Sequence, residues 1–135
     1  MNTLVFRLLP GEDLLLRLRQ EMVKHHIEAA VVLSSVGSLT SVNIRPAGEE
    51  VSCELVGKFE ILTLNGTLAT TGEHLHIAVA DKDMQTFGGH LMEKSIIFTT
   101  AEIVLGVLPD ITFARTYCPL SGYEELDITW KGEKR

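Results

Sequence analysis

Three of the five histidines in this chain of 135 residues fall within one short stretch. His74 and His76 stand two apart in a run rich in Ile, Val and Ala, which predicts a strand with both imidazoles on one face. Gly88 and Gly89 follow, where they permit a close turn that brings His90 back toward the strand. This pattern favours a metal site or an acid/base cluster. The alternative is that one or two of the histidines are hydrogen-bonded side chains in or near the core.

As a metal site, the stretch supplies His74, His76 and His90 as ligands for zinc or another divalent ion. Three protein ligands leave one coordination position open, which is the arrangement of catalytic rather than structural zinc. Two carboxylates are candidate partners of the site. Glu102 interrupts an apolar strand-like run, where an unpaired buried charge would cost several kcal/mol, and Asp81 follows the histidine strand.

The elements that must position these residues are mostly strands. Seven or eight segments have strand-like composition, whereas one segment has helical periodicity. Glu12 and Asp13 open that helix with negative charge, and an apolar stripe of helical spacing follows. The stripe consists of Leu14, Leu15, Leu18 and Met22. One helix among many strands predicts an α+β domain with a mostly antiparallel sheet, and its uncovered sheet surface predicts subunit contacts.

Two further turns are predicted from glycine. Asn65-Gly66 between apolar runs is the strongest short-range hairpin signal in the chain. Gly37-Ser38 breaks a second apolar run, and residues 39–45 are expected to return antiparallel to it.

The composition is that of one soluble globular domain spanning residues 1–135, with 45% apolar and 22% charged residues. No apolar run approaches the roughly 18 residues of a membrane span. Arg7 interrupts the N-terminal apolar stretch, so no signal peptide is expected. Cys53 and Cys118 are therefore expected to be free thiols, and the expected location is the cytoplasm, with no membrane partner.

The net charge opposes one class of function, nucleic-acid binding, and the context of the serines opposes another, catalysis by a serine nucleophile. A formal charge of −6 opposes DNA binding by the bare surface, because affinity for nucleic acid comes largely from Lys and Arg. Ser34, Ser35 and Ser38 lack the G-x-S-x-G context of a nucleophile. The residues therefore favour a protein without serine-based catalysis, and enzymatic activity is expected only if a metal supplies it.

Six motifs, taken together and in order, resemble the PPC domain, which is shared by plants and prokaryotes and accompanies AT-hook motifs in land plants. The likeness covers about residues 4–117 and is of the stand-alone prokaryotic type. The motifs are Leu8–Leu14 (LLPGEDL), Val32–Leu39 (VLSSVGSL), Gly57–Leu62 (GKFEIL), His74–Asp81 (HLHIAVAD), Gly88–Leu91 (GGHL) and Thr99–Val104 (TTAEIV).

This resemblance implies an α+β fold with a mixed, largely antiparallel sheet of about seven strands and one main helix, assembling as a homotrimer. It also implies a DNA-binding or transcription-associated role and contacts with other regulatory proteins. The partner-binding residues implied by the family are Gly57, Lys58, Phe59, Glu60, Ile61 and Leu62. The Arg-Gly-Arg-Pro element by which the plant proteins bind AT-rich minor grooves is absent, since Asn43-Ile44 precedes the single Arg-Pro, Arg45-Pro46.

Three functions follow as hypotheses. The first is a homotrimeric DNA-binding or transcription-associated protein without an AT-hook. The second is a trimer that binds a metal through three histidines and has enzymatic activity. The third is a protein-interaction module that docks partners through Gly57 to Leu62.

Overall fold

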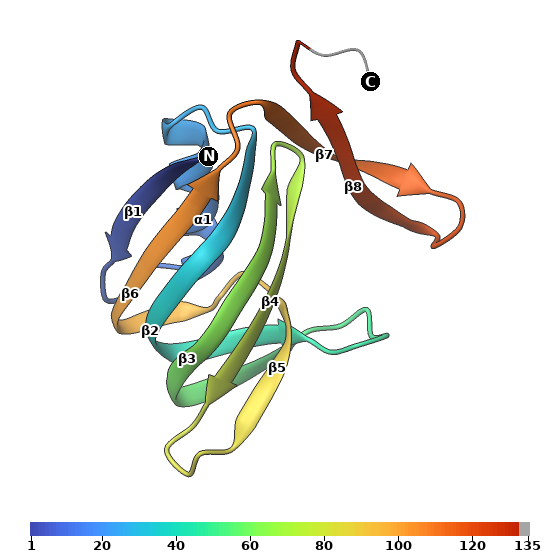
Figure 1. Ribbon diagram of the computed structural model, residues 1–135. Coiled ribbons are helices and arrows are strands. Elements are labelled where there is room, and N and C mark those ends of the chain that lie inside the picture. Colours follow the sequence, from blue (N-terminus) through green and yellow to red (C-terminus); the bar gives the residue numbers. More distant parts are fainter. Residues whose placement is uncertain (133–135) are drawn as a thin grey trace.

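The computed structural model describes residues 1–132. In this part of the chain, six strands form one sheet in the order β1-β6-β2-β3-β4-β5, two more strands form a separate hairpin, and one helix is present (Figure 1). The elements are β1 (Asn2–Leu8), α1 (Leu14–Lys24), β2 (Ala29–Arg45), β3 (Cys53–Ala69), β4 (Gly72–Ala80), β5 (Thr86–Leu91), β6 (Ile96–Val107), β7 (Ile111–Cys118) and β8 (Tyr123–Trp130). The predicted α+β class with a largely antiparallel sheet is confirmed. The pairings between these strands are all antiparallel, so the expected mixed character is absent from the described residues.

Helix α1 begins after Asp13, whose side chain accepts hydrogen bonds from the backbone N–H groups of Leu16 at 3.1 Å and Lys94 at 2.7 Å. The predicted apolar stripe is buried in the main core, where each large side chain stabilises the fold by about 1.5–3 kcal/mol. Packing therefore holds this helix, since 11 residues are too few for a stable isolated helix. The same length falls well short of the roughly 20 residues of a bilayer span, so the described chain has no membrane-crossing helix.

Strand β2 takes part in two regions of the sheet. Along one edge its 17 residues pair with β3 as far as Ile44. Along the other edge they pair with β6 as far as Ser41 and then with β5, with Arg45 opposite His90 (Figure 1). The register of β2 shifts against both neighbours between Leu39 and Ser41, and such irregularities bend a strand. β2 pairs with β3, β3 with β4, β4 with β5, and β5 with the end of β2, so these four strands close into a ring. The ring places the end of β2 beside the histidine strands.

The turns predicted at Gly37-Ser38 and at Asn65-Gly66 are wrong, because both glycines lie within continuous strands. β2 runs through Gly37, and β3 runs through Asn65 and Gly66. A Cβ atom added at Gly37 would lie 2.2 Å from the carbonyl oxygen of Thr100. One added at Gly66 would lie 1.9 Å from the carbonyl oxygen of His74. These positions need glycine because a neighbouring backbone approaches too closely for any side chain.

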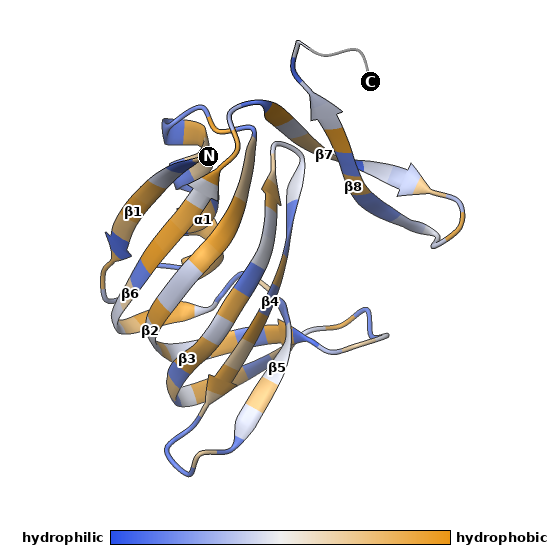
Figure 2. Cartoon of the chain, viewed as in Figure 1, coloured by the Kyte–Doolittle hydropathy of each residue, from blue (hydrophilic) through white to orange (hydrophobic). Residues whose placement is uncertain are grey.

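The β7–β8 hairpin stands apart from the six-stranded sheet (Figure 1). It is attached at its base, where Phe113 is buried and its backbone bonds to Glu28 and Thr70. Apolar residues occur along both strands of the hairpin (Figure 2). Five large ones are exposed: Tyr117, Leu120, Tyr123, Ile128 and Trp130. Residues 1–132 leave this apolar surface uncovered.

Candidate metal centre

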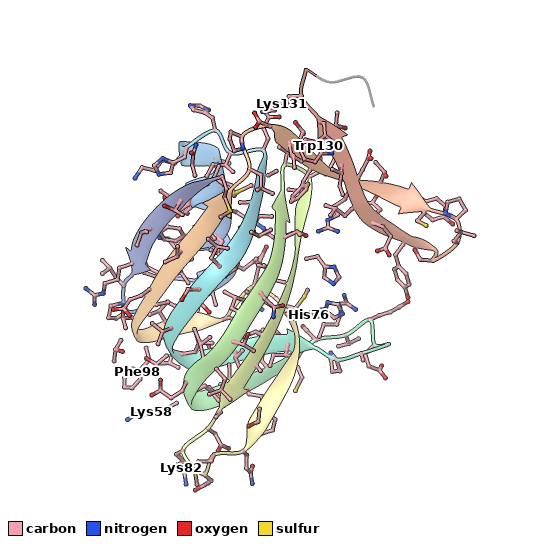
Figure 3. All side chains as sticks on the ribbon, viewed as in Figure 1. Lys58, His76, Lys82, Phe98, Trp130 and Lys131 are labelled. Atoms are coloured by element: carbon pink, nitrogen blue, oxygen red, sulfur yellow. The ribbon has the colours of Figure 1, made fainter. Side chains whose placement is uncertain are left out.

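His74 and His76 project from the same face of β4, as expected from their spacing. Both are exposed, whereas the alternating residues Leu75 and Ile77 are each only 2% exposed and belong to the core. Because the apolar residues of this strand must face the core, the imidazoles are directed outward. Figure 3 shows His76 on the side of β4 toward the β7–β8 hairpin.

His90 reaches the same place from β5, where it lies directly opposite His76 in the antiparallel pair. The chain reverses between these strands in a turn organised by Asp81. The carboxylate Oδ1 of Asp81 accepts hydrogen bonds from the backbone N–H groups of Asp83 at 2.8 Å and Gln85 at 3.0 Å. The return of His90 therefore depends on an aspartate turn.

Gly88 and Gly89 have a different role from the predicted one, because they lie within β5. A Cβ atom on Gly89 would be 2.7 Å from the Ile44 side chain and 2.8 Å from the Arg45 carbonyl oxygen. One on Gly88 would be 3.1 Å from the carbonyl oxygen of Ile77. The two glycines thus allow β5 to fit between β2 and β4 and close the ring.

The three imidazole rings form one compact group. Ring centroids are 5.0 Å apart for His74 and His76, 5.3 Å for His74 and His90, and 4.8 Å for His76 and His90. One ring nitrogen from each residue lies within 4.8 Å of the other two. Zinc–imidazole bonds are about 2.0–2.1 Å long, so two ligands of one ion lie at most about 4 Å apart. Small rotations of these side chains would close the group around an ion.

The surroundings favour the neutral form of two of these imidazoles, His74 and His90, by partly desolvating them. Burial, and then the neighbouring histidine and Arg115, lower the pKa of His74 below 6.5, while Glu125 opposes the shift. Burial, and then Arg45, lower the pKa of His90 below the same value. Neutral imidazole is the form that binds metals, so a lowered pKa favours this chemistry at neutral pH.

The two arginines were not singled out in the sequence, because they lie on strands that are distant from the histidines along the chain. Arg45 lies opposite His90 in the β2–β5 pair. Arg115 Nη2 donates a 2.6 Å hydrogen bond to Thr67 Oγ1, and Thr67 lies opposite His74 in the β3–β4 pair. Among the described residues, neither arginine forms an ion pair with a carboxylate. Both guanidinium charges remain uncompensated by direct pairing within residues 1–132.

A pocket of about 410 Å³ adjoins the histidines, and its lining includes His74, His90 and Arg45. Arg19 on α1 also lines this pocket and forms ion pairs with both Glu73 and Glu93. The single charge of Arg19 offsets one of these two carboxylates, and Arg45 and Lys94 are the other basic side chains of the lining.

The two predicted carboxylate partners do not join the histidine group. Asp81 comes five residues after His76, about 16 Å farther along at 3.3 Å per residue, and it organises the turn. Glu102 is exposed on β6, between Arg7 of β1 and Val36 of β2. Strands β2 and β3 separate it from β4. Its position on an outward face explains why an acid interrupts an apolar run.

The predicted partner-binding segment, residues 57–62, alternates between core and surface on β3. Phe59 and Ile61 are 5% exposed and belong to the core, so substituting them would damage the fold itself. Gly57, Lys58, Glu60 and Leu62 are exposed. Lys58 Nζ lies 5.1 Å from the ring centroid of Phe98, and Figure 3 labels the two residues close together at the lower left of the molecule. Partner binding by the exposed residues stays a prediction.

Comparison with protein families matches residues 1–109 to the Plants and Prokaryotes Conserved (PCC) domain. The matched range contains α1 and the six-stranded sheet with all three histidines. It ends before the β7–β8 hairpin.

Solved structures with the same architecture come from several prokaryotes. A hypothetical protein from Salmonella cholerae-suis is 43% identical, with a TM-score of 0.94 over 96% of this chain and 94% of that one. The metal-containing protein of Archaeoglobus fulgidus is 25% identical, with a TM-score of 0.79 over 96% and 93%. A protein from Bacteroides thetaiotaomicron, whose name gives DNA binding as a provisional function, is 21% identical with a TM-score of 0.83 over 93% and 91%. This last likeness shows the fold alone.

Two curated relatives from Synechococcus strains are each named bifunctional protein GlmU. Each is 44% identical to this chain over 122 residues, which is 90% of the chain. The aligned region covers 19% of one relative and 20% of the other, so the chain spans about a fifth of their length.

Proposed function

This chain belongs to the Plants and Prokaryotes Conserved domain family, called the PPC domain above, and from this premise we propose that it binds one divalent metal ion through His74, His76 and His90. The observation that carries the proposal is the grouping of three ring nitrogens within 4.8 Å of one another. The metal-containing relative from Archaeoglobus fulgidus supports it. Zinc is the proposed ion, because three imidazoles with a fourth position open are a common zinc arrangement.

A metal held in this way would be open to solvent on one side. His74 and His76 are exposed, and the adjoining pocket reaches the group, so the open coordination position could accept water or a small ligand. A bound divalent ion supplies Lewis acidity and lowers the pKa of a coordinated water. It would also join β4 to β5 by bonds additional to the backbone ladder.

Metal analysis tests this proposal. The protein is incubated with zinc, dialysed and examined by mass spectrometry for its metal content, and we expect one ion per chain. Replacing His76 with Ala should remove most of the metal, because two remaining imidazoles bind an ion far more weakly. His26→Asn is the matched control, since His26 is exposed and far from the group along the chain, and Asn tolerates its φ of 53°. A wild-type protein without stoichiometric metal would contradict the proposal.

DNA association is a second candidate, and it is the one that the family resemblance implies. The provisional name of the Bacteroides protein favours it, and the formal charge of −6 opposes it. A gel-shift assay with AT-rich and mixed duplexes at low salt tests this function. We expect any binding to weaken steeply with added salt, and no shift for any duplex would eliminate the candidate.

A further inference from the structure

We infer that the metal centre binds an oxyanion, namely the carboxylate or phosphate group of a small molecule, which completes the coordination of the ion and contacts Arg45, while Arg115 adds positive charge nearby. This inference rests on the proposed metal site and specifies the class of ligand that it accepts. Neither the family match nor the names of the relatives assign such a ligand.

The first argument is electrostatic. A divalent cation at the three histidines would lie near two arginines, and like charges in a partly buried site repel one another. Glu125 acts on His74 in the opposite sense, but one carboxylate cannot balance a divalent ion and two guanidinium groups. Glu73 and Glu93 form ion pairs with Arg19, and these three side chains together carry one net negative charge, so the acids still fall short of the positive charge. An anion between the ion and the arginines would remove the repulsion.

The second argument concerns the donors that remain for such an anion. A guanidinium group carries five N–H donors in a planar fork that matches carboxylate and phosphate oxygens. Arg115 donates one hydrogen bond, from Nη2 to Thr67. The buried Nε of Arg115 has no hydrogen-bond partner in the described part of the chain. The one hydrogen bond found for the Arg45 side chain within residues 1–132 goes to the backbone carbonyl of Glu49. Both side chains therefore retain donor capacity beside the histidines.

The third argument is the available space. The pocket of about 410 Å³ is lined by His74, His90 and Arg45, but not by His76 or Arg115, so a molecule inside it could meet two of the proposed ligands and one arginine at once. Pockets of about 300–1,000 Å³ accommodate small molecules. Its wall also contains the apolar residues Leu15 and Leu91, which could contact the rest of such a molecule. We therefore place a small organic anion or inorganic phosphate in this pocket.

Cobalt provides a spectroscopic test. Wild-type protein is loaded with Co²⁺, and sodium acetate or inorganic phosphate is titrated in at constant ionic strength while the visible absorption of the cobalt is followed. We expect a saturable spectral change with at least one of the two anions. In Arg45→Gln the anion should bind about tenfold more weakly, because a hydrogen bond between charged groups is lost while the metal ligands stay. Arg45→Lys, which keeps the charge but loses the fork, should fall between the two.

Arg7→Gln is the matched control, since it removes the same charge from β1, on the far edge of the sheet, and should leave the anion affinity unchanged. Circular dichroism melts establish that each variant is folded. A response to acetate alone identifies a carboxylate ligand, and one to phosphate alone identifies a phosphate ligand; both outcomes support the inference.

Three results overturn it. A cobalt spectrum that neither anion changes would do so while leaving the metal function intact. Equal anion affinity in wild type and Arg45→Gln would remove the arginine from the site. Anion binding that is equally strong without metal would show an arginine site independent of the ion. Failure of wild-type protein to bind cobalt or zinc would instead disprove the proposed function itself.

Discussion

At the scale of single residues, the histidine group combines positions that a strand fixes with charges that other strands supply. His74 and His76 share a face because of the two-residue period of β4, and His90 comes opposite His76 because of the β4–β5 register. Arg45 and Arg115 then act on the protonation of the imidazoles through space. The chemistry of the site therefore depends on residues from β2, β4, β5 and β7.

The lowered pKa of His90 leads to a prediction about the metal-free protein. Well above pH 6.5 the His90 imidazole is neutral in both the folded and the unfolded chain, so its protonation does not lower the free energy of unfolding. As the pH falls below 6.5, the unfolded chain binds a proton more readily than the folded one, and stability is lost down to the folded pKa. We expect wild type to lose stability relative to His90→Gln between pH 7.5 and pH 5.5, as measured by urea unfolding.

The contribution of Arg45 can be separated by NMR titration of the imidazole protons. Burial lowers the pKa of His90 first and Arg45 lowers it further, so Arg45→Gln should raise it toward 6.5. Arg7→Gln provides the control for a general change in charge. An unchanged His90 titration in Arg45→Gln would show that this arginine does not act on the site.

At the scale of elements, close backbone approach determines where the histidine strands lie. Gly66 lets β3 pass against the backbone of His74, and Gly89 lets β5 fit against the end of β2. Gly66 lies opposite Leu75, between His74 and His76, and Gly89 lies beside His90. The ring of β2, β3, β4 and β5 is therefore the scaffold of the metal centre.

Gly66→Ala tests this role of close approach. The added Cβ would lie 1.9 Å from the carbonyl oxygen of His74, so either strand must move. We expect a loss of about 1–3 kcal/mol or more in the free energy of unfolding, and weaker metal binding because His74 shifts. Gly57→Ala on the same strand is the control, since its nearest atom is 3.4 Å away, at the end of the Phe59 ring. Equal stability of the two variants, measured by urea unfolding, would contradict the argument.

At the scale of the whole molecule, the chain leaves apolar surface that its own fold does not cover. Val5 on β1 and Val36 on β2 are 68% and 55% exposed, and the β7–β8 hairpin carries its exposed aromatic residues beyond the sheet. Exposed apolar patches of this kind mark interaction sites. They support the predicted self-association, in which the hairpin would be covered by another copy.

The homotrimer implied by the family resemblance is the specific prediction at this scale. Light scattering coupled to size exclusion should give three times the 14.9 kDa mass of one chain. Tyr123→Lys should lower the observed mass, because a charge on the exposed hairpin would oppose burial of its apolar surface. Lys82→Ala, at an exposed turn, is the control. A monomeric wild type would disprove the trimer.

The sequence by itself determined the features that follow from local periodicity. The two-residue spacing of His74 and His76 indicates a shared face, and the apolar stripe from Leu14 to Met22, preceded by Glu12 and Asp13, indicates a helix. Both predictions hold because period and capping depend on residues within a few positions of one another. The motif order likewise identified the family.

Only the tertiary structure decided which glycines turn the chain and which charges reach the site. The sequence around Gly37 and Gly66 is typical of turns. In the fold, however, each glycine faces the backbone of a neighbouring strand, and a local sequence pattern carries no information about that neighbour. Arg45 and Arg115 reach the histidines, whereas Asp81 and Glu102 do not, because strand order and register bring together residues far apart in sequence. These long-range pairings are set by the closure of the ring, and local propensity does not specify them.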